Sequence, residues 1–482
     1  MRLSNAIFGR PLASIEEGEQ KIGWPAGVSM LGLDALSSAA YGPEAAMTLL
    51  IPLGAAGIAH IVPISTTIVV LLLIVTISYQ QTIVAYPGGG GSYTVARQNL
   101  GTFAGLLAAA ALMLDYVLVV AVGISAGVGA LVSAVPSLQP HTLALCLAIL
   151  AAIALVNLRG VRESGAAFVL PTYLFVACLG IVIAIGAVKT LIAGGAPQPV
   201  VAPPAAAPVV TAATTWLLLR AFASGCTAMT GVEAVSNGVA VFREPSVPNA
   251  RTTLAVIVGT LVTMLAGIAY LARAYGIAAT EPGTAGYQSV LSMLVSAVVG
   301  RGAFYYVCIA SILAVLALSA NTGFADFPRL CRMVAQDGFL PRVFASRGRR
   351  LVYSYGIYVL TALAGFLLVL FGGITDRLIP LFAVGAFLAF TLSQAGMVVH
   401  WMRTDEPHRV RGMAVNGVGA AATAVTLAVV FVAKFTEGAW VTMLLVPGML
   451  TAFGAVRRHY HSVSLEIANP FPLRVDRIQP PI

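Results

Sequence analysis

Charged side chains are scarce in this sequence. Only 9% of its 482 residues are Asp, Glu, Lys or Arg, whereas an average soluble chain contains about 25%. This scarcity excludes a soluble globular enzyme and a disordered chain, because both need abundant polar residues to face water. Hydrophobic residues make up 59% of the chain instead. The composition therefore predicts a polytopic integral membrane protein.

Residues that build disulfide frameworks, metal centres and catalytic sites are also few. The five cysteines and six histidines lack the paired spacing of a disulfide framework or a metal site. No nucleophile–base pair is evident, so we expect neither an enzyme nor a cofactor. The residues up to Lys21 are largely polar and charged, unlike a cleavable signal peptide.

The net charge of +9 indicates membrane topology rather than a nucleic-acid partner. Basic residues gather in short loops between apolar runs, and such residues concentrate on the cytoplasmic side of a membrane protein. If successive apolar runs cross the bilayer in turn, few basic residues fall on the other side, mainly Lys189, Arg273, Arg377 and Lys434. We therefore expect both termini in the cytoplasm, with the chain crossing the plasma membrane an even number of times.

Twelve apolar segments approach the length of a spanning helix, which needs about 20 residues. They cover residues 24–52, 58–84, 102–133, 141–158, 166–188, 213–240, 252–272, 286–319, 353–372, 378–400, 412–433 and 437–455. The sequence thus predicts an all-α integral membrane fold with 12 transmembrane helices and the lipid bilayer as a partner.

Small and polar residues interrupt two of these segments, the first across Leu33–Glu44 and the sixth across Ala223–Glu233. Non-helical backbone survives at membrane depth only where protein or a water-filled cavity satisfies its polar groups. Matching interruptions in two halves of a chain indicate a transporter's binding site. Because these two lie five segments apart, we predict that helices 1 and 6 are broken and that two five-helix repeats are inverted relative to each other. A simple kink at each position is the alternative.

This reading divides the chain into six parts. They are a cytoplasmic N-terminal segment (1–23), helices 1–5 (24–188), an external Pro/Ala-rich loop (189–212), helices 6–10 (213–400), helices 11–12 (401–455) and a short cytoplasmic tail (456–482). The glycine-rich run at 86–93 lacks the Lys of a phosphate-binding loop, so we predict a close helix crossing or a re-entrant bend there. Residues 321–337 predict a short cytoplasmic helix.

Three acidic residues, Asp34, Asp115 and Glu233, lie well inside apolar segments. A charge at the bilayer centre is costly, so such residues are candidates for function. Each is predicted to bind a cation, to carry a proton, or to do both. The alternative is a structural acid that is paired with Arg220 or with backbone amides at a helix break.

Hydroxyl groups near the two interruptions are the second group of candidates. Neutral oxygens can replace the hydration shell of a monovalent alkali cation, and the side chains placed to do so are Ser37, Ser38, Tyr41, Thr227 and Thr230. Ser and Thr also join membrane helices by hydrogen bonds. For Ser37 and Ser38, cation binding and helix packing both stay open. Beyond a site for a monovalent cation, we expect no metal site.

Several motifs together resemble the amino acid–polyamine–organocation superfamily. These are the glycine-rich run at 86–93, Asn157-Leu158-Arg159-Gly160 and the stretch at 321–329. The pair Asp34 and Tyr41, seven residues apart, and the stretch at 224–237 are most similar to its potassium-uptake branch, the KUP family with the KimA-type potassium–proton symporters. The likeness runs from about residue 22 to about residue 400.

The resemblance implies a LeuT-type fold and proton-coupled potassium import. It also implies Asp34, Tyr41, Thr230 and Glu233 at the cation site, with Asp115 as a further acidic position. Three positions depart from the family pattern, because Val119, Gly123 and Phe382 replace oxygen ligands. The sequence also lacks the large C-terminal cytoplasmic domain of the prototype, so its dimer and its nucleotide regulation are not carried over, although a homodimer stays open.

The departures keep other functions open. An amino acid or polyamine permease is the second hypothesis, in which a polyamine would tolerate Asp34 better than a substrate carboxylate would. A receptor that keeps the fold without transport is the third. Binding without accumulation in vesicles would distinguish it from a transporter.

Overall fold

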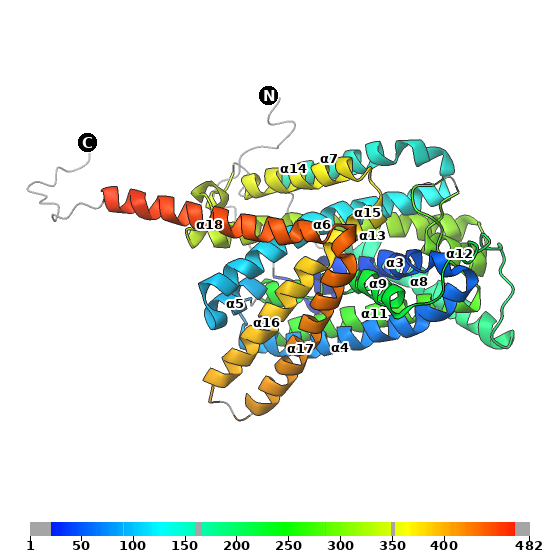
Figure 1. Cartoon of the computed structure of the whole chain (residues 1–482), viewed down its shortest axis with the longest axis horizontal. Coiled ribbons are helices and arrows are strands. Elements are labelled where there is room, and N and C mark those ends of the chain that lie inside the picture. The colour runs from blue at the N-terminus through cyan, green and yellow to red at the C-terminus, as the bar shows by residue number, and fades with distance from the viewer. Residues whose placement is uncertain are drawn as a thin grey trace, which may run out of the picture.

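The computed structural model describes residues 21–89, 91–159, 166–284, 286–348, 352–405, 407 and 409–467, which form a helical bundle (Figure 1). Within these ranges the backbone forms no strand, only an isolated bridge between Ile22 and Phe242. The α-helices are α2 (Trp24–Leu31), α3 (Leu33–Thr48), α4 (Ile61–Ala85), α5 (Ser92–Leu100), α6 (Thr102–Ala134), α7 (Thr142–Leu158), α8 (Ala166–Ile192), α9 (Thr215–Gly225), α10 (Ala234–Asn237), α11 (Ser246–Ala274), α12 (Val290–Val299), α13 (Ala303–Gln336), α14 (Ser354–Leu370), α15 (Thr375–Phe382), α16 (Val384–Arg403), α17 (Arg409–Lys434) and α18 (Trp440–Ile467). The 3-10 helices are η2 (Ile51–His60), η3 (Pro136–His141), η4 (Cys226–Met229), η5 (Val239–Val241), η6 (Arg342–Ala345) and η7 (Phe435–Glu437).

Long apolar helices dominate the described part of the chain. Nine helical stretches there are long and apolar enough to cross a membrane, namely Ile51–Ala85, Thr102–Ala134, Pro136–Leu158, Phe168–Ile192, Ser246–Ala274, Ala303–Gln336, Thr375–Arg403, Arg409–Glu437 and Trp440–Ile467. The apolar helices α12 and α14 are shorter. These stretches confirm the prediction of a multi-pass, all-α membrane protein.

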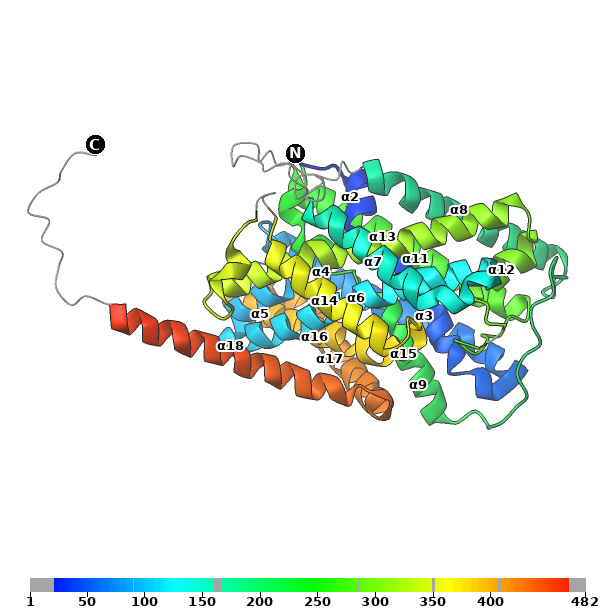
Figure 2. The same cartoon turned by 90° about the horizontal axis from the view of Figure 1, so that it is seen from above.

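The core of the bundle surrounds α6. This helix packs against α13, α16 and α5, and its run of four alanines from Ala108 to Ala111 is fully buried. Small side chains let membrane helices approach closely. By contrast, α18 buries only Thr442 and Phe453, and it projects beyond the rest of the bundle (Figures 1 and 2).

Several predicted segment boundaries are wrong. The segment 286–319 forms two helices, because the chain turns through a left-handed Gly300 (φ 77°) between α12 and α13. α13 then continues through the predicted separate helix at 321–337 as far as Gln336, just before the left-handed Gly338. The segment 378–400 lies within one apolar stretch, Thr375–Arg403, which α15 and α16 share on either side of Ala383. α18 continues beyond residue 455 to Ile467.

The first predicted interruption is also wrong in its extent, since α3 contains the whole stretch from Leu33 to Glu44. Only Gly32 separates α2 from α3, with near-helical angles (φ −95°, ψ −2°). A Cβ at Gly32 would lie 2.7 Å from the Ile257 side chain of α11, so this glycine allows a close helix contact. The hydroxyls of this helical stretch are satisfied within the helix by bonds to the preceding turn, as Ser37 Oγ donates to the Asp34 carbonyl (2.9 Å).

Candidate functional site

The second helix break lies where the sequence predicts it. α9 ends at Gly225, the short η4 follows, and α10 begins at Ala234. Between η4 and α10 the backbone is extended at Thr230 (φ −67°, ψ 154°) and left-handed at Gly231 (φ 82°). Because side chains with a Cβ rarely adopt such a φ, glycine makes this turn possible. The chain is therefore unwound within an apolar segment.

The unwound segment packs directly against α3. A Cβ at Gly231 would lie 2.6 Å from Ala35 N and 2.7 Å from Asp34 Oδ2, so only glycine permits this approach. Ser38 Oγ lies 2.7 Å from the carbonyl oxygen of Ala228 and donates a hydrogen bond to the broken stretch. The Ser38 hydroxyl thus joins the two helices, which favours a packing role for it.

Neutral oxygen atoms gather beside the break. Tyr41 Oη and Thr230 Oγ1 are 3.3 Å apart, and Thr230 Oγ1 also donates to the Thr227 carbonyl (3.2 Å). Thr227 Oγ1 donates to the Ser224 carbonyl (2.7 Å) within its own turn. The structure therefore brings Tyr41 and Thr230 together, both buried, whereas the hydroxyl of Thr227 is engaged locally.

Three carboxyl groups are buried in the same region. Asp34, Asp115 and Glu233 are 5%, 1% and 2% exposed. The charges of Glu233 and Asp34 act on Asp115, and that of Glu233 acts on Asp34. The three predicted acids thus form one electrostatic group. In the described ranges, however, no three Asp, Glu, His or Cys side chains converge closely enough to hold a metal ion as a set, so a bound cation would combine a carboxylate with neutral oxygens.

The charges that act most strongly on Asp34 and Asp115 are acidic. Both carboxylate oxygens of Asp115 and Oε2 of Glu233 are buried and have no hydrogen-bond partner among the described residues. Buried polar atoms are normally paired, and a charge at the bilayer centre costs about 3 kcal/mol or more. These oxygens can therefore take up a cation or a proton.

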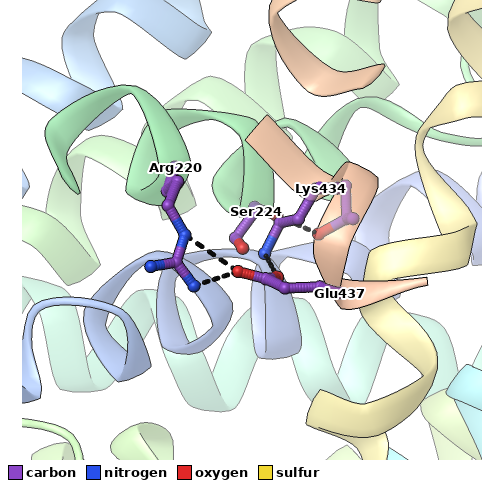
Figure 3. A network of polar contacts seen from close by, with 5 residues as sticks. Arg220, Ser224, Lys434 and Glu437 are labelled. Atoms are coloured by element: carbon purple, nitrogen blue, oxygen red, sulfur yellow. Dashed lines mark hydrogen bonds and ion pairs between the residues drawn. The ribbon is translucent and has the colours of Figure 1, made fainter. Parts of the chain in front are cut away.

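Arg220, the basic residue considered above as a partner for the acids, is engaged elsewhere (Figure 3). Its guanidinium pairs with Glu437 of η7, and Lys434 Nζ at the end of α17 lies 2.7 Å from the second Glu437 oxygen. Lys434 is only 3% exposed. This network, which we call the Arg220–Glu437–Lys434 network, ties α9 to α17. The pairing of Arg220 with the buried acids is therefore wrong.

The three positions that depart from the family pattern are packed in the interior. A Cβ at Gly123 of α6 would lie 2.8 Å from Ser319 Oγ of α13, so the Ser319 hydroxyl occupies the space that a side chain at 123 would need. Val119 and Phe382 are buried. The ring centroid of Phe382 lies 6.2 Å from that of Tyr41, which places position 382 beside the Tyr41 ring.

A cavity of about 600 Å³ lies at the end of the bundle that carries Lys21. We call it the vestibule. Its wall reaches Tyr116 and Asn237, and the Asn237 amide donates to Tyr116 Oη (3.3 Å). A Cβ at Gly91 would lie 2.7 Å from Asn237 Oδ1. The described part of the glycine-rich run thus lies against the end of α10, in agreement with the predicted close crossing.

α5, which follows the glycine-rich run, is anchored to the end of α13. Asp337 accepts hydrogen bonds from Tyr93 Oη (2.5 Å) and from the Arg97 guanidinium. Burial raises the pKa of Tyr93 above its ordinary value, so the hydroxyl keeps its proton and remains a donor. This contact holds the wall of the vestibule in place.

The other end of the bundle is closed at α3. Glu44 accepts hydrogen bonds from Tyr287 Oη (2.7 Å) and from Val290 N at the start of α12 (3.1 Å). A cavity of only about 20 Å³ lies between Tyr41 and this contact, while one of about 300 Å³ lies beside Tyr287 and Asp376. Sequence reasoning gave Glu44 no role, although an acid inside an apolar segment was the available signal. Tyr287 and Asp376 were missed.

Comparison with known proteins now identifies the family. Residues 30–453 match a family model described as amino acid permease. The chain belongs to this family. It is 41% identical over 461 residues to the potassium transporter KimA of Bacillus subtilis (strain 168), a match that covers 96% of this chain and 75% of that protein. The predicted resemblance is confirmed, and this permease is a membrane transporter rather than an enzyme.

We predict that Gly231→Ala will disrupt the site of this permease. The added methyl group would meet Ala35 N and Asp34 Oδ2 at a backbone conformation that costs about 1–3 kcal/mol for other residues. The variant should therefore melt at a lower temperature in detergent and lose uptake in vesicles. Gly259→Ala is the matched control, because a Cβ there has no neighbour within 4 Å. Equal melting temperatures for the two variants would contradict the prediction.

We also predict that Glu437→Gln will destabilise the bundle, because it leaves Lys434 buried without its carboxylate partner. Removing one partner of a buried ion pair costs about 3–5 kcal/mol. Asp405→Asn removes an exposed partner of Arg409 (Asp405 side chain 99% exposed), and should change the free energy of unfolding by at most about 0.5 kcal/mol. The melting temperatures of both variants in detergent check this difference, and equal losses would count against it.

Proposed function

We propose that this permease imports potassium across the plasma membrane by alternating access, driven by protons. The observation that carries the proposal is the group of buried acids, Asp34, Asp115 and Glu233, on which no basic side chain among the described residues acts strongly. Such a group favours a cation over an anionic or neutral solute. The 41% identity to a potassium transporter supports potassium as that cation.

A LeuT-type arrangement of twelve transmembrane helices is part of the proposal. The nine long spans, together with the split pair α2–α3, the broken pair α9–α10 and the short α14, add up to twelve. The discontinuities at Gly32 and Thr230–Gly231 lie five segments apart and pack near each other, which supports two inverted repeats at 24–188 and 213–400, with 401–455 appended. With both termini in the cytoplasm, the vestibule, which lies at the end of the bundle that carries Lys21, faces the cytoplasm. The Glu44 contact then closes the external side.

The proposed roles follow from the geometry of the oxygens. Asp34 supplies the charge for the cation, and Tyr41 and Thr230 supply neutral oxygens beside it, with backbone support from Thr227. Glu233, whose Oε2 is unpartnered, carries the proton. Asp115 is a second acid for proton coupling, since Asp34 and Glu233 both act on it.

An amino acid or polyamine is the second candidate substrate, since the matching family model is described as amino acid permease. The carboxylate of an amino acid would be repelled by Asp34 beside the break. A polyamine has no such conflict, because its charge is positive. The two classes can be tested in parallel with potassium.

The test is uptake by the purified full chain in proteoliposomes with an acidic exterior. Rubidium (as a potassium tracer), amino acids and polyamines are offered separately. We expect rubidium to accumulate and to stop accumulating when the pH gradient is dissipated. Accumulation of an amino acid or polyamine without rubidium would replace the proposed substrate, and binding without any accumulation would indicate a receptor.

We predict that Glu233→Gln abolishes the rubidium accumulation that the pH gradient drives, because the side chain can no longer exchange a proton. The variant should still be expressed and should melt near the wild-type temperature, since the amide is uncharged and nearly isosteric. Glu466→Gln, on the exposed end of α18, is the control. Wild-type accumulation by Glu233→Gln would remove Glu233 from the mechanism.

Phe382→Tyr is predicted to tighten potassium binding. The new hydroxyl would add a neutral oxygen beside Tyr41, whose ring centroid is 6.2 Å away. One added polar contact of about 0.7 kcal/mol corresponds to an apparent KM for rubidium about threefold lower. Phe431→Tyr, on α17, should leave KM unchanged. A KM that is unchanged or raised in Phe382→Tyr would show that position 382 does not face the cation.

A further inference from the structure

A second group of buried oxygens lies outside the proposed cation ligands. The hydroxyls of Tyr79, Ser92 and Ser393 have no well-formed hydrogen bond among the described residues, and neither has Oε2 of Glu233. The three hydroxyl side chains are at most 1% exposed. Buried oxygens are normally paired, so this group holds unused capacity to donate and accept protons. We call Tyr79, Ser92 and Ser393 the hydroxyl cluster.

The members of the hydroxyl cluster come from three helices. Tyr79 of α4 faces the hydroxyls of Ser92, at the start of α5, and of Ser393 on α16. Its ring is held edge-on by Phe390 (centroid distance 5.9 Å, interplanar angle 81°), which precedes Ser393 by one helical turn on the same face. The tyrosine hydroxyl is therefore held in one place by packing.

The cluster has links both to Glu233 and to the wall of the vestibule. Glu233 immediately precedes α10, which packs against α4, and its charge acts on Tyr79. On the other side, Ser92 is flanked by Gly91 and Tyr93, and both of these line the vestibule. The cluster is thus linked to the acid through the packing of α10 on α4, and to the cavity wall through the neighbours of Ser92.

The acids around this cluster favour proton uptake. Besides Glu233, the charge of Asp115 acts on Tyr79. Asp326, which lines the vestibule, acts on Glu233. Arg329, one turn further along α13, lies 3.2 Å from Asp326 Oδ1 and so offsets that charge at the cavity wall.

We infer that the hydroxyl cluster conducts protons between Glu233 and the vestibule, an inference that rests on the proposed proton coupling. A bridging water takes the proton of Glu233 and passes one of its own to Tyr79 Oη, because these two buried oxygens have no direct partner, while the hydrogen of the tyrosine hydroxyl moves to Ser92 Oγ. The hydrogen of Ser92 passes to water in the vestibule, so each hydroxyl ends with one hydrogen as before. Hydroxyls can act in this way because each both donates and accepts. Ser393 positions the Tyr79 hydroxyl from α16.

The test compares two modes of rubidium flux through the reconstituted full chain. Uptake driven by a pH gradient requires proton release to the interior, whereas exchange of external rubidium for internal potassium at equal pH does not. For Tyr79→Phe, which keeps the ring packing but lacks the hydroxyl, we expect the ratio of pH-driven uptake to exchange to fall at least about tenfold. Ser92→Ala should lower the same ratio.

The matched control is Tyr305→Phe, which removes the hydroxyl of an equally buried tyrosine that bonds Ser292 (2.7 Å) away from the cluster. Its ratio should equal that of the wild type. An unchanged ratio in both Tyr79→Phe and Ser92→Ala overturns the inference, and so does an equal fall of both flux modes. If Tyr79→Phe fails to fold, the ratio in Ser92→Ala decides.

Three outcomes separate this inference from other interpretations. A raised KM for rubidium with an unchanged flux ratio would make the cluster a second cation site and overturn the proton route. A wild-type chain that accumulates no rubidium under the pH gradient overturns the proposed function, and the route with it. If the wild type is driven by protons and both Tyr79→Phe and Ser92→Ala show the same flux ratio, the proton route is overturned and the proposed function is not.

Discussion

Negative charge without a protein counter-charge is the constraint around which this bundle is organised. Asp34, Asp115 and Glu233 are removed from water and repel one another, and each charge would be costly at the bilayer centre. Lys434 is buried and Arg220 is half-buried, but both of these basic residues are committed to Glu437. The Arg220–Glu437–Lys434 network therefore neutralises its own charges. It supplies no counter-charge to Asp34, Asp115 and Glu233. A basic side chain of the protein would have neutralised these acids permanently. Acids without such a partner can instead bind a cation and release it.

The close contact between α3 and the unwound stretch supplies the oxygens that a dehydrated cation needs. Backbone can approach backbone there because the residues are small. A Cβ at Gly42 would lie 2.5 Å from the Ala228 Cβ, and one at Gly231 would meet Asp34. Replacing either glycine would separate the charged helix from the broken one. The neutral oxygens of Tyr41 and Thr230 and the carboxylate of Asp34 would then no longer share one region.

Sequence reasoning succeeded where a residue is anomalous in its own segment. An acid in an apolar run is such an anomaly, as is a stretch of Gly and Thr within a helix, so the three acids and the second break were predicted. It failed where tertiary contacts decide. Gly32 lets Ile257 pack against the junction of α2 and α3, and the hydroxyl of Ser319 fills the space beside Gly123. Tyr79 carried no signal, because a tyrosine in a membrane helix is ordinary until its neighbours are known. Family likeness predicted which residues form the cation site, but it could not show that Arg220 is engaged elsewhere.

The number of buried charges relates the proposed cation site to the proposed proton coupling. Three carboxylates that are all ionised carry three negative charges, and one monovalent cation neutralises only one of them. The remaining repulsion between two buried acids raises the free energy of the loaded site, and it falls when one of them takes up a proton. A proton suits this role because it needs no coordination shell, and the neutral oxygens beside the break are then left for the cation. In the proposed mechanism, cation binding at Asp34 and proton binding at Glu233 each lower the same excess of negative charge. On this view, the site holds more acidic groups than one monovalent cation can neutralise. That excess of negative charge makes a second positive species, the proton, part of the transport cycle.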